Sequence, residues 1–298
     1  MHPPEAEALL TEQLRQQFGL RPDTVLRQQV QQALDDLLRA SGRNLEALVA
    51  QLQAAQAPWQ DFLDRVLVPE SWFRREAGAL SALAAEFGSR TAAPQPLRVL
   101  CAPCSAGEEP ISIALLLRDL GWPDEALHID GVDLSRTAIA AAERGVYRKH
   151  SFRGVGQDWL KRHFEIVADG PNRRLRQPLA AASLQFSRAD LFALPRTAIG
   201  YDVVFCRNLL IYLEPAARQR LLQQLRLLCR EDGLLFVGHA EAPLLQDAGL
   251  EALRERMSFG FRNRPRRAAA APLGACRAWG ASAANRPQRS ISHRLFAP

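Results

Sequence analysis

The sequence predicts a doubly wound α/β fold preceded by a small all-α domain and interrupted by a short inserted β-subdomain. An apolar run at 97–102 stops at Pro103, a turn of small residues follows, and apolar residues then recur at helical spacing up to Leu120. This order of strand, small-residue turn and helix is the opening unit of a doubly wound sheet. Strand-like and helix-like segments alternate after it, whereas residues 5–65 show apolar residues at helical spacing alone.

Four helices are expected in the N-terminal part. Gly19 ends the first apolar helical pattern, and Asp23 with Thr24 begins the second, because Asp and Thr favour helix starts and Gly favours helix ends. Asn44 begins a third pattern, and a short fourth one surrounds Trp59. The arginines of this part have two readings, a docking face or a solvated helix surface.

An aromatic and arginine cluster follows the helices. Ser71 is predicted to cap the segment that comes after it. Trp72 and Phe73 stand directly before Arg74 and Arg75. Composition alone leaves two readings open, a cleft lining between domains or ordinary packing with solvated charges.

The α/β domain is expected to begin after a Pro-containing linker near residues 91–96. The segment around Asp169-Gly170 separates two short strand-like runs and predicts the inserted hairpin. The predicted strands are 97–102, 126–132, 183–188, 201–206 and 234–238, with a last strand pair that includes Phe259 and Phe261. The predicted helices are 108–120, 135–144 and 215–229. Expected boundaries are 1–85 for the helical domain, 86–263 for the α/β domain, 163–182 for the hairpin and 264–298 for a disordered basic tail.

The turn after the first predicted strand lacks the G-x-G-x-x-G dinucleotide pattern, since only Gly107 is present. Glu108 and Glu109 at the helix start would repel a pyrophosphate and suit a ligand with an ammonium group or hydroxyls. That preference points to S-adenosylmethionine (SAM), although any α/β protein with a small-residue turn is the plainer reading. Asp133, at the end of the second strand, either binds ribose hydroxyls or caps the helix that begins at Ser135.

Composition bounds the function in several ways. The 298 residues carry a net charge of +6, which suits an acidic partner, although an arginine-rich genome and a basic tail explain part of it. Five cysteines at irregular spacing argue against a disulfide framework. Cys101 and Cys104 form a C-x-x-C without a second ligand pair, so no metal site is predicted, and the pair straddles a strand end, unlike a redox motif. No apolar run of membrane-spanning length and no secretory signal are seen, so a cytoplasmic protein is expected.

Several segments match one family in order: VPESWFRRE, RVLCAPCSAGEEPISIA, GVDLSRTAIAAAERGVY, FSRADL, DVVFCRNLLIYLEP and GLLFVGHAEA. Together they resemble the CheR-type chemotaxis receptor methyltransferases over residues 10–262. The VPESW form is most similar to members that serve surface-growth pathways. Many of those members carry a helical-repeat domain after the methyltransferase, and this sequence is expected to be a variant without it.

This resemblance implies a Rossmann-like SAM-dependent methyltransferase domain with an all-helical N-terminal domain and a small β-subdomain. The implied activity is SAM-dependent methyl esterification of glutamate side chains on chemoreceptors. The implied partner is the cytoplasmic helical region of a chemoreceptor, with no nucleic acid and no direct membrane insertion. The oligomeric state is left open.

The resemblance also assigns site residues by position. Arg75 takes the place of the active-site arginine, and Tyr212 is expected to orient the acceptor. The cofactor is expected to contact Ser71, Arg75, Glu109, Asp133, Asp190, Leu191, Arg207 and Asn208. The sequence departs from the family pattern at Pro69, Arg74, Pro103 and Asp190, of which Arg74 would be an unusual residue in a cleft lining. Two alternatives therefore stay open, a SAM-binding protein with impaired catalysis and a methyltransferase for another acceptor such as RNA or a small molecule.

Overall fold

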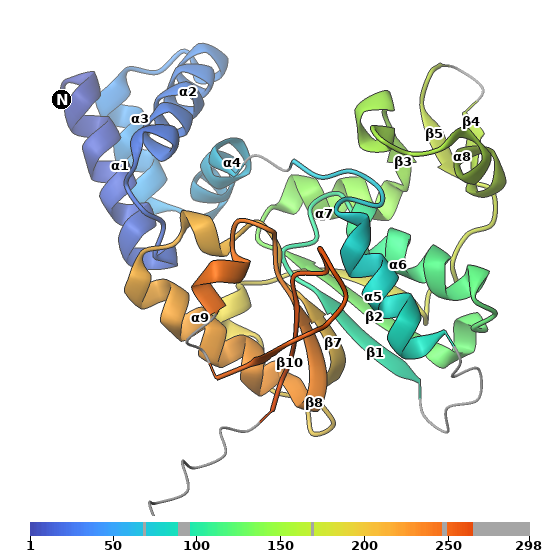
Figure 1. The fold of residues 1–298 in the computed structure, drawn as a ribbon. Coiled ribbons are helices and arrows are strands. Elements are labelled where there is room, and N and C mark those ends of the chain that lie inside the picture. Colours follow the sequence, from blue (N-terminus) through green and yellow to red (C-terminus); the bar gives the residue numbers. More distant parts are fainter. Residues whose placement is uncertain (68–69, 89–95, 168–169, 246–248, 265–298) are drawn as a thin grey trace, which may run out of the picture. The chain divides into compact units, whose positions relative to one another are not determined.

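A seven-stranded sheet, mostly parallel, forms the centre of the described chain in this computed structural model (Figure 1). The structure describes residues 1–67, 70–88, 96–167, 170–245 and 249–264. The strand order is β6-β2-β1-β7-β8-β10-β9, and the antiparallel pairs are the two that β10 makes, with β8 and with β9. The strands are β1 (Leu97–Cys101), β2 (Leu127–Asp133), β6 (Leu184–Arg188), β7 (Tyr201–Phe205), β8 (Cys229–Phe236), β9 (Glu251–Ala252) and β10 (Gly260–Arg262).

The strand order creates a crevice at the carboxyl ends of β1 and β7. The chain runs outward from β1 through β2 to β6, and then returns to place β7 on the other side of β1. In open α/β sheets, ligands bind where the order reverses in this way. The predicted α/β fold is therefore confirmed, and its topology brings the residues that follow β1, β2 and β7 together.

Alternating residues of the central strands face two separate cores, as the pleat of a strand requires. Leu100, Val204 and Leu235 belong to a core shared with the N-terminal helices and α9 (Pro215–Leu228). Their neighbours Val99 and Val203 belong to the opposite core, which contains residues of α5 (Ala77–Phe87) and α6 (Glu108–Asp119). A further helix, α7 (Arg136–Arg144), packs against β2 and β6. The sheet is thus covered on both faces, which explains its near-continuous apolar strands.

The N-terminal helices form as predicted (Figure 1). Gly19 ends the first helix in the left-handed conformation, with a φ of 67°. Asp23 and Asn44 cap the second and third helices, where their side chains accept hydrogen bonds from the backbone N–H groups of Leu26 and Ala47. The four helices are α1 (Pro3–Phe18), α2 (Thr24–Ser41), α3 (Leu45–Ala54) and α4 (Gln56–Val66).

Two local predictions were wrong. Ser71 caps no helix: α5 begins at Ala77, and its N-cap is Glu76 in the left-handed conformation. Strand β8 begins at Cys229, five residues before the predicted start, and its register against β7 shifts between Tyr201 and Val203.

A second, three-stranded antiparallel sheet has the order β3-β5-β4. The pairing of β4 (Phe164–Ile166) with β5 (Arg173–Leu175) confirms the predicted hairpin. The third strand, β3 (Val146–Tyr147), and the short helix α8 (Gln157–His163) were not predicted. Buried Phe73 packs on Tyr147, Phe152 and Phe164 of this region, with ring centroids 4.8–5.0 Å apart.

Some predictions fall outside the described residues: Pro69, most of the linker at 91–96, Asp169 and all of the tail after Arg264. Residues 1–265 form one compact unit, and the predicted domain boundary at 85 falls within α5, so that boundary stays a prediction. None of the helices in the described ranges combines the length and apolar character that a bilayer-spanning segment needs.

Candidate active site

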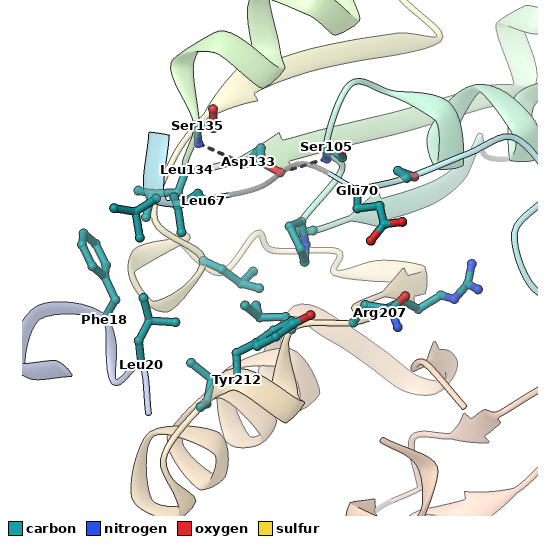
Figure 2. Close-up of a pocket in the computed structure, with 18 of the residues that line it drawn as sticks. Phe18, Leu20, Leu67, Glu70, Ser105, Asp133, Leu134, Ser135, Arg207 and Tyr212 are labelled. Atoms are coloured by element: carbon teal, nitrogen blue, oxygen red, sulfur yellow. Dashed lines mark hydrogen bonds between the residues drawn. The ribbon is translucent and has the colours of Figure 1, made fainter. Parts of the chain in front are cut away.

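A cavity of about 450 Å³ opens at the carboxyl ends of β1, β2 and β7. This volume lies in the range of small-molecule sites. Figure 2 shows Phe18, Leu20, Leu67 and Leu134 at one end of it, and Glu70 and Arg207 at the other. All nine residues assigned by resemblance line this cavity: Ser71, Arg75, Glu109, Asp133, Asp190, Leu191, Arg207, Asn208 and Tyr212.

Asp133 joins two of the turns that form the cavity wall (Figure 2). Its Oδ2 accepts a hydrogen bond of 2.9 Å from the backbone N–H of Ser105, and its Oδ1 accepts one of 2.9 Å from that of Ser135. The cap of α7 is Ser135 itself, whose side chain accepts from the N–H of Ala138. Burial raises the pKa of Asp133. A carboxylate has about four lone-pair sites, so this side chain keeps acceptor capacity for a ligand.

Arg207 is the centre of a buried ion-pair network. Only 4% of its side chain is exposed, and it lies 2.5 Å from an oxygen of Glu109 and 2.8 Å from one of Glu76. It also donates a hydrogen bond of 3.1 Å to the carbonyl of Arg75. Burial alone would lower the pKa of Arg207, but the charges of Glu109 and Glu76 raise it overall. Burial raises the pKa of Glu109 despite the neighbouring guanidinium. The network holds the side chains of Arg207 and Glu109 in place, and the charge of each stabilises the charge of the other.

Arg75 lies on a loop with unusual backbone geometry. Its neighbours Arg74 and Glu76 have φ values of 57° and 51°, in the region that non-glycine residues seldom occupy. The Arg75 guanidinium lies 4.1 Å from the ring centroid of Trp72 and donates to the carbonyl of Glu70 at 3.0 Å. Burial, and then the charge of Arg207, lowers the pKa of Arg75. Its Nε is buried and has no hydrogen-bond partner among the described residues, so the group can still bind a ligand.

The unusual residue Arg74 does not line the cavity, contrary to the expectation from the resemblance. Its side chain is exposed and its guanidinium lies 5.6 Å from the ring centroid of Trp159. The backbone N–H of Arg74 donates to the hydroxyl of Ser112 on α6, at 2.9 Å. Because the φ of Arg74 is positive, its side chain leaves the loop in a different direction from that of Arg75.

The remaining assigned residues also border the cavity, and they differ in backbone conformation, exposure and hydrogen bonding. Asn208 has a φ of 60°, and Tyr212 is 46% exposed. Among the described residues no side chain hydrogen-bonds the Tyr212 phenol. Asp190 accepts a hydrogen bond of 2.9 Å from the N–H of Phe192, and Leu191 is buried. Ser71 is partly buried at the cavity wall.

Three contributors to the site were not predicted from the sequence. Glu241 is fully buried and accepts backbone hydrogen bonds from Asn208, Leu210 and Gly238, at 2.8, 2.6 and 2.6 Å. Its segment, GHAEA, was part of the resemblance and was the available signal. The hydroxyl of Ser105 is buried at the cavity without a partner among the described residues.

The third contributor is the end of α1 with the α1–α2 connection, from which Phe18, Leu20 and Arg21 line the cavity. Nothing in the local sequence pattern of two helices predicts that contact, because it forms across almost 200 residues of chain.

The C-x-x-C pair lies inside the fold, away from solvent. Cys101 and Cys104 are buried, and burial raises the pKa of both thiols. A raised pKa disfavours the thiolate that redox chemistry requires. In the described ranges, no group of His, Cys, Asp or Glu side chains is arranged to hold a metal ion.

The donor set fits SAM along the length of the cavity. Charged groups of Arg75, Glu109 and Arg207 suit an amino-acid end, Asp133 suits ribose hydroxyls, and the apolar wall around Leu134 suits a flat base. The unpartnered Arg75 Nε and Ser105 Oγ are further polar atoms that a ligand can satisfy.

Comparison with known proteins gives the same family as the sequence motifs. The family described as CheR methyltransferase, SAM binding domain, matches residues 70–255. The chain is 36% identical over 254 residues to the "Probable biofilm formation methyltransferase WspC" of Pseudomonas putida, which covers 83% of this chain and 59% of that protein. It is 37% identical over 222 residues to the protein of the same name in Pseudomonas aeruginosa, which covers 72% of this chain and 51% of that protein.

A third relative, the chemotaxis protein methyltransferase of Salmonella typhimurium, is 33% identical over 213 residues, and the match covers 70% of each chain. The chain thus spans somewhat more than half the length of the two WspC relatives. With a match over most of the α/β domain and a site in the expected crevice, the chain belongs to the CheR methyltransferase family and contains its SAM-binding domain.

Proposed function

We propose that this chain transfers the methyl group of SAM to glutamate side chains of chemoreceptors in a chemosensory pathway. The observation that supports it best is that Arg75, Glu109, Asp133, Arg207 and Tyr212 line one and the same cavity, in a chain with the SAM-binding domain of the CheR family.

Each end of the cavity has a role in holding the cofactor. Asp133 accepts hydrogen bonds from ribose hydroxyls, since it has unused acceptor sites at the end of β2. Glu109, held by Arg207, faces the amino-acid portion together with Ser71. Asp190 and Leu191 border the base, where Leu191 supplies apolar contact. Asn208 completes the wall beside Arg207.

The acceptor needs no strong general base. A glutamate side chain has a pKa of about 4.3 and is ionised at neutral pH, so its oxygen is ready to attack. When bound, SAM supplies an electrophilic methyl group, and the new carbon–oxygen bond forms as the carbon–sulfur bond breaks, giving a methyl ester and S-adenosylhomocysteine. The protein must align the carboxylate and exclude water, and such positioning is worth roughly 7–11 kcal/mol in favourable cases.

Two side chains are suited to positioning the acceptor. The Arg75 guanidinium binds a carboxylate through two parallel hydrogen bonds, and Trp72 holds its plane in place. Tyr212 has a phenol O–H without a partner among the described residues, and this group donates a hydrogen bond to the acceptor carboxylate. Arg75 must not bind the carboxylate so tightly that the ground state is stabilised as much as the transition state.

The proposed partner is the cytoplasmic helical region of a chemoreceptor, and the protein acts in the cytoplasm. Relatives named chemotaxis protein methyltransferases support this choice, and the net charge of +6 suits an acidic partner. Of the four departures that raised impaired catalysis, Arg74 lies outside the cavity, which weakens that alternative.

The test is transfer of radiolabelled methyl from SAM to receptor cytoplasmic fragments of the same organism. Label that is lost in mild base identifies an ester, and fragments with alanine at the candidate glutamates are the matched control. Cofactor binding without transfer to any fragment would select the impaired binding protein, and label on RNA or on a small molecule would select the other acceptor.

Asp133→Asn is expected to weaken binding of S-adenosylhomocysteine by about 10–100-fold, because hydrogen bonds to a charged group are worth about 1.5–3 kcal/mol. Isothermal titration calorimetry measures the affinity. Asp130→Asn is the matched control, since Asp130 lies on the same strand, binds the Tyr201 hydroxyl at 2.8 Å and does not line the cavity. Equal affinities for the two variants would remove Asp133 from the site.

A further inference from the structure

Backbone hydrogen bonds join the connection between α1 and α2 to the loop that bears Tyr212, and Figure 2 shows Leu20 and Tyr212 among the residues that line the cavity. The backbone N–H of Arg21 donates to the carbonyl of Tyr212 at 2.8 Å, and the N–H of Glu214 donates to the carbonyl of Gly19 at 2.8 Å. These bonds form an antiparallel bridge between Leu20 and Leu213, which are both buried. We propose that this bridge, formed by residues 19–21, is a positioning element that sets the place of Tyr212 in the cavity.

Gly19 makes the bridge possible for two physical reasons. Its φ of 67° lies in the left-handed region, where a side chain causes strain. A Cβ at this position would also overlap the Cβ of Ala217 on α9. The absence of a side chain therefore lets α1 end directly against α9, which brings Leu20 to Leu213. An ion pair between Arg15 and Glu214, at 3.4 Å, lies beside the same contact.

The two halves of the Tyr212 loop are held by different parts of the protein. Glu241 holds the half before Tyr212 through the N–H groups of Asn208 and Leu210. After Tyr212, the bridge holds the backbone on one side, and Arg218 donates to the carbonyl of Leu213 at 3.2 Å. Only the bridge bonds the Tyr212 carbonyl among the described residues, and the phenol itself has no partner there. The direction of the phenol thus depends on the α1–α2 connection.

This inference rests on the proposed function for the role of Tyr212, but the bridge itself does not. If Tyr212 orients the acceptor carboxylate, loosening the bridge should slow methyl transfer while the cofactor, held mainly from β1, β2 and β7, still binds. The helical domain would then act as a positioning part of the active site through residues that do not touch the reacting atoms.

The chain offers a matched set of variants. Gly19→Ala adds both strain and overlap with Ala217. Gly42→Ala adds the same kind of strain at the end of α2, where φ is 64° and nothing lies within 4 Å of an added Cβ. The double variant Gly19→Ala/Ala217→Gly moves one methyl group across the contact and removes the overlap. Ala217→Gly alone completes the set.

Two readouts are measured on each variant: amide hydrogen exchange at Arg21 and Glu214, and kcat, KM and S-adenosylhomocysteine affinity. Gly19→Ala is expected to lose protection at both amides and to lower kcat by about tenfold or more, since small misplacements at reacting groups cost up to about 10²-fold. Its cofactor affinity should fall by much less than its kcat, because Leu20 and Arg21 also line the cavity but the polar contacts to the cofactor come from the ends of β1, β2 and β7. The double variant should regain protection and most of the kcat, and Gly42→Ala should resemble the parent chain.

Unchanged protection in Gly19→Ala would overturn the bridge. Lost protection with unchanged kcat would overturn its positioning role, as would a kcat loss of the same size in Gly42→Ala. If the parent chain transferred no methyl to any receptor fragment, the proposed function would fail, and the exchange data would still decide whether the bridge holds the Tyr212 loop.

Discussion

Replacing Arg75 with alanine is expected to lower kcat for methyl transfer by about 10²–10³-fold, the usual cost of removing one preorganised donor from a reacting group. Cofactor affinity should fall by no more than about tenfold, because the cofactor loses its contact with Arg75 but keeps those with Asp133, Glu109 and Arg207. The reason for this difference is that the Arg75 guanidinium is fixed over Trp72 and keeps a buried Nε without a protein partner. Transfer kinetics on a receptor fragment and calorimetry with S-adenosylhomocysteine measure the two quantities.

Two further variants separate charge from geometry at this position. Arg75→Lys keeps the positive charge but loses the planar fork, so it should recover only a small part of kcat. Arg74→Ala is the matched control, because Arg74 is adjacent in sequence but exposed over Trp159 and outside the cavity. A loss of affinity as large as the loss of kcat in Arg75→Ala would contradict the assigned role, as would an equal kcat loss in Arg74→Ala.

The parts of the site that follow from sequence are those fixed by the ends of strands. The residues after β1, β2 and β7 could be predicted to meet, because parallel strands bring their carboxyl ends to one edge. Asp133 was predicted from its place at a strand end, and Arg207 was assigned by the resemblance; both line the cavity. Their charge partners were not all predictable, since Glu76 reaches Arg207 only through the unusual backbone at the start of α5.

Other features were missed because they depend on contacts that no local pattern encodes. Strand β3 has only two residues, too few for an alternating pattern, and it exists because β5 pairs with it. The cap predicted at Ser71 was wrong because the chain first forms the loop that holds Phe73 against the second sheet. The bridge between residues 20 and 213 joins backbone groups, which every residue type has.

Replacing Arg207 with alanine is expected to cause the largest loss of stability among these variants. The change leaves the largely buried carboxylates of Glu76 and Glu109 without the guanidinium that now lies 2.8 and 2.5 Å from them. Removing one partner of a buried ion pair costs about 3–5 kcal/mol. At about 2–4 °C per kcal/mol for a chain of this size, the melting temperature should fall by on the order of 10 °C. Differential scanning calorimetry measures this change.

The same variant should show a defined dependence on pH. Burial already raises the pKa of Glu109, and Arg207 opposes that shift, so its loss moves the pKa higher still. A carboxyl whose pKa is raised in the folded state stabilises the fold when protonated, and this contribution disappears as the pH rises through that pKa. The deficit in melting temperature should therefore be smaller at about pH 5 than at about pH 8.

Two comparisons test whether the buried charges cause the effect. Arg39→Ala removes an exposed arginine, 73% exposed, from its pair with Asp36, and should change stability by no more than about 1 kcal/mol. Arg207→Met/Glu109→Gln removes both charges while keeping most of the volume, and should recover part of the stability that Arg207→Ala loses. If Arg207→Ala melted like Arg39→Ala at both pH values, the ion pairs of Arg207 with Glu76 and Glu109 would not be what stabilises this part of the fold.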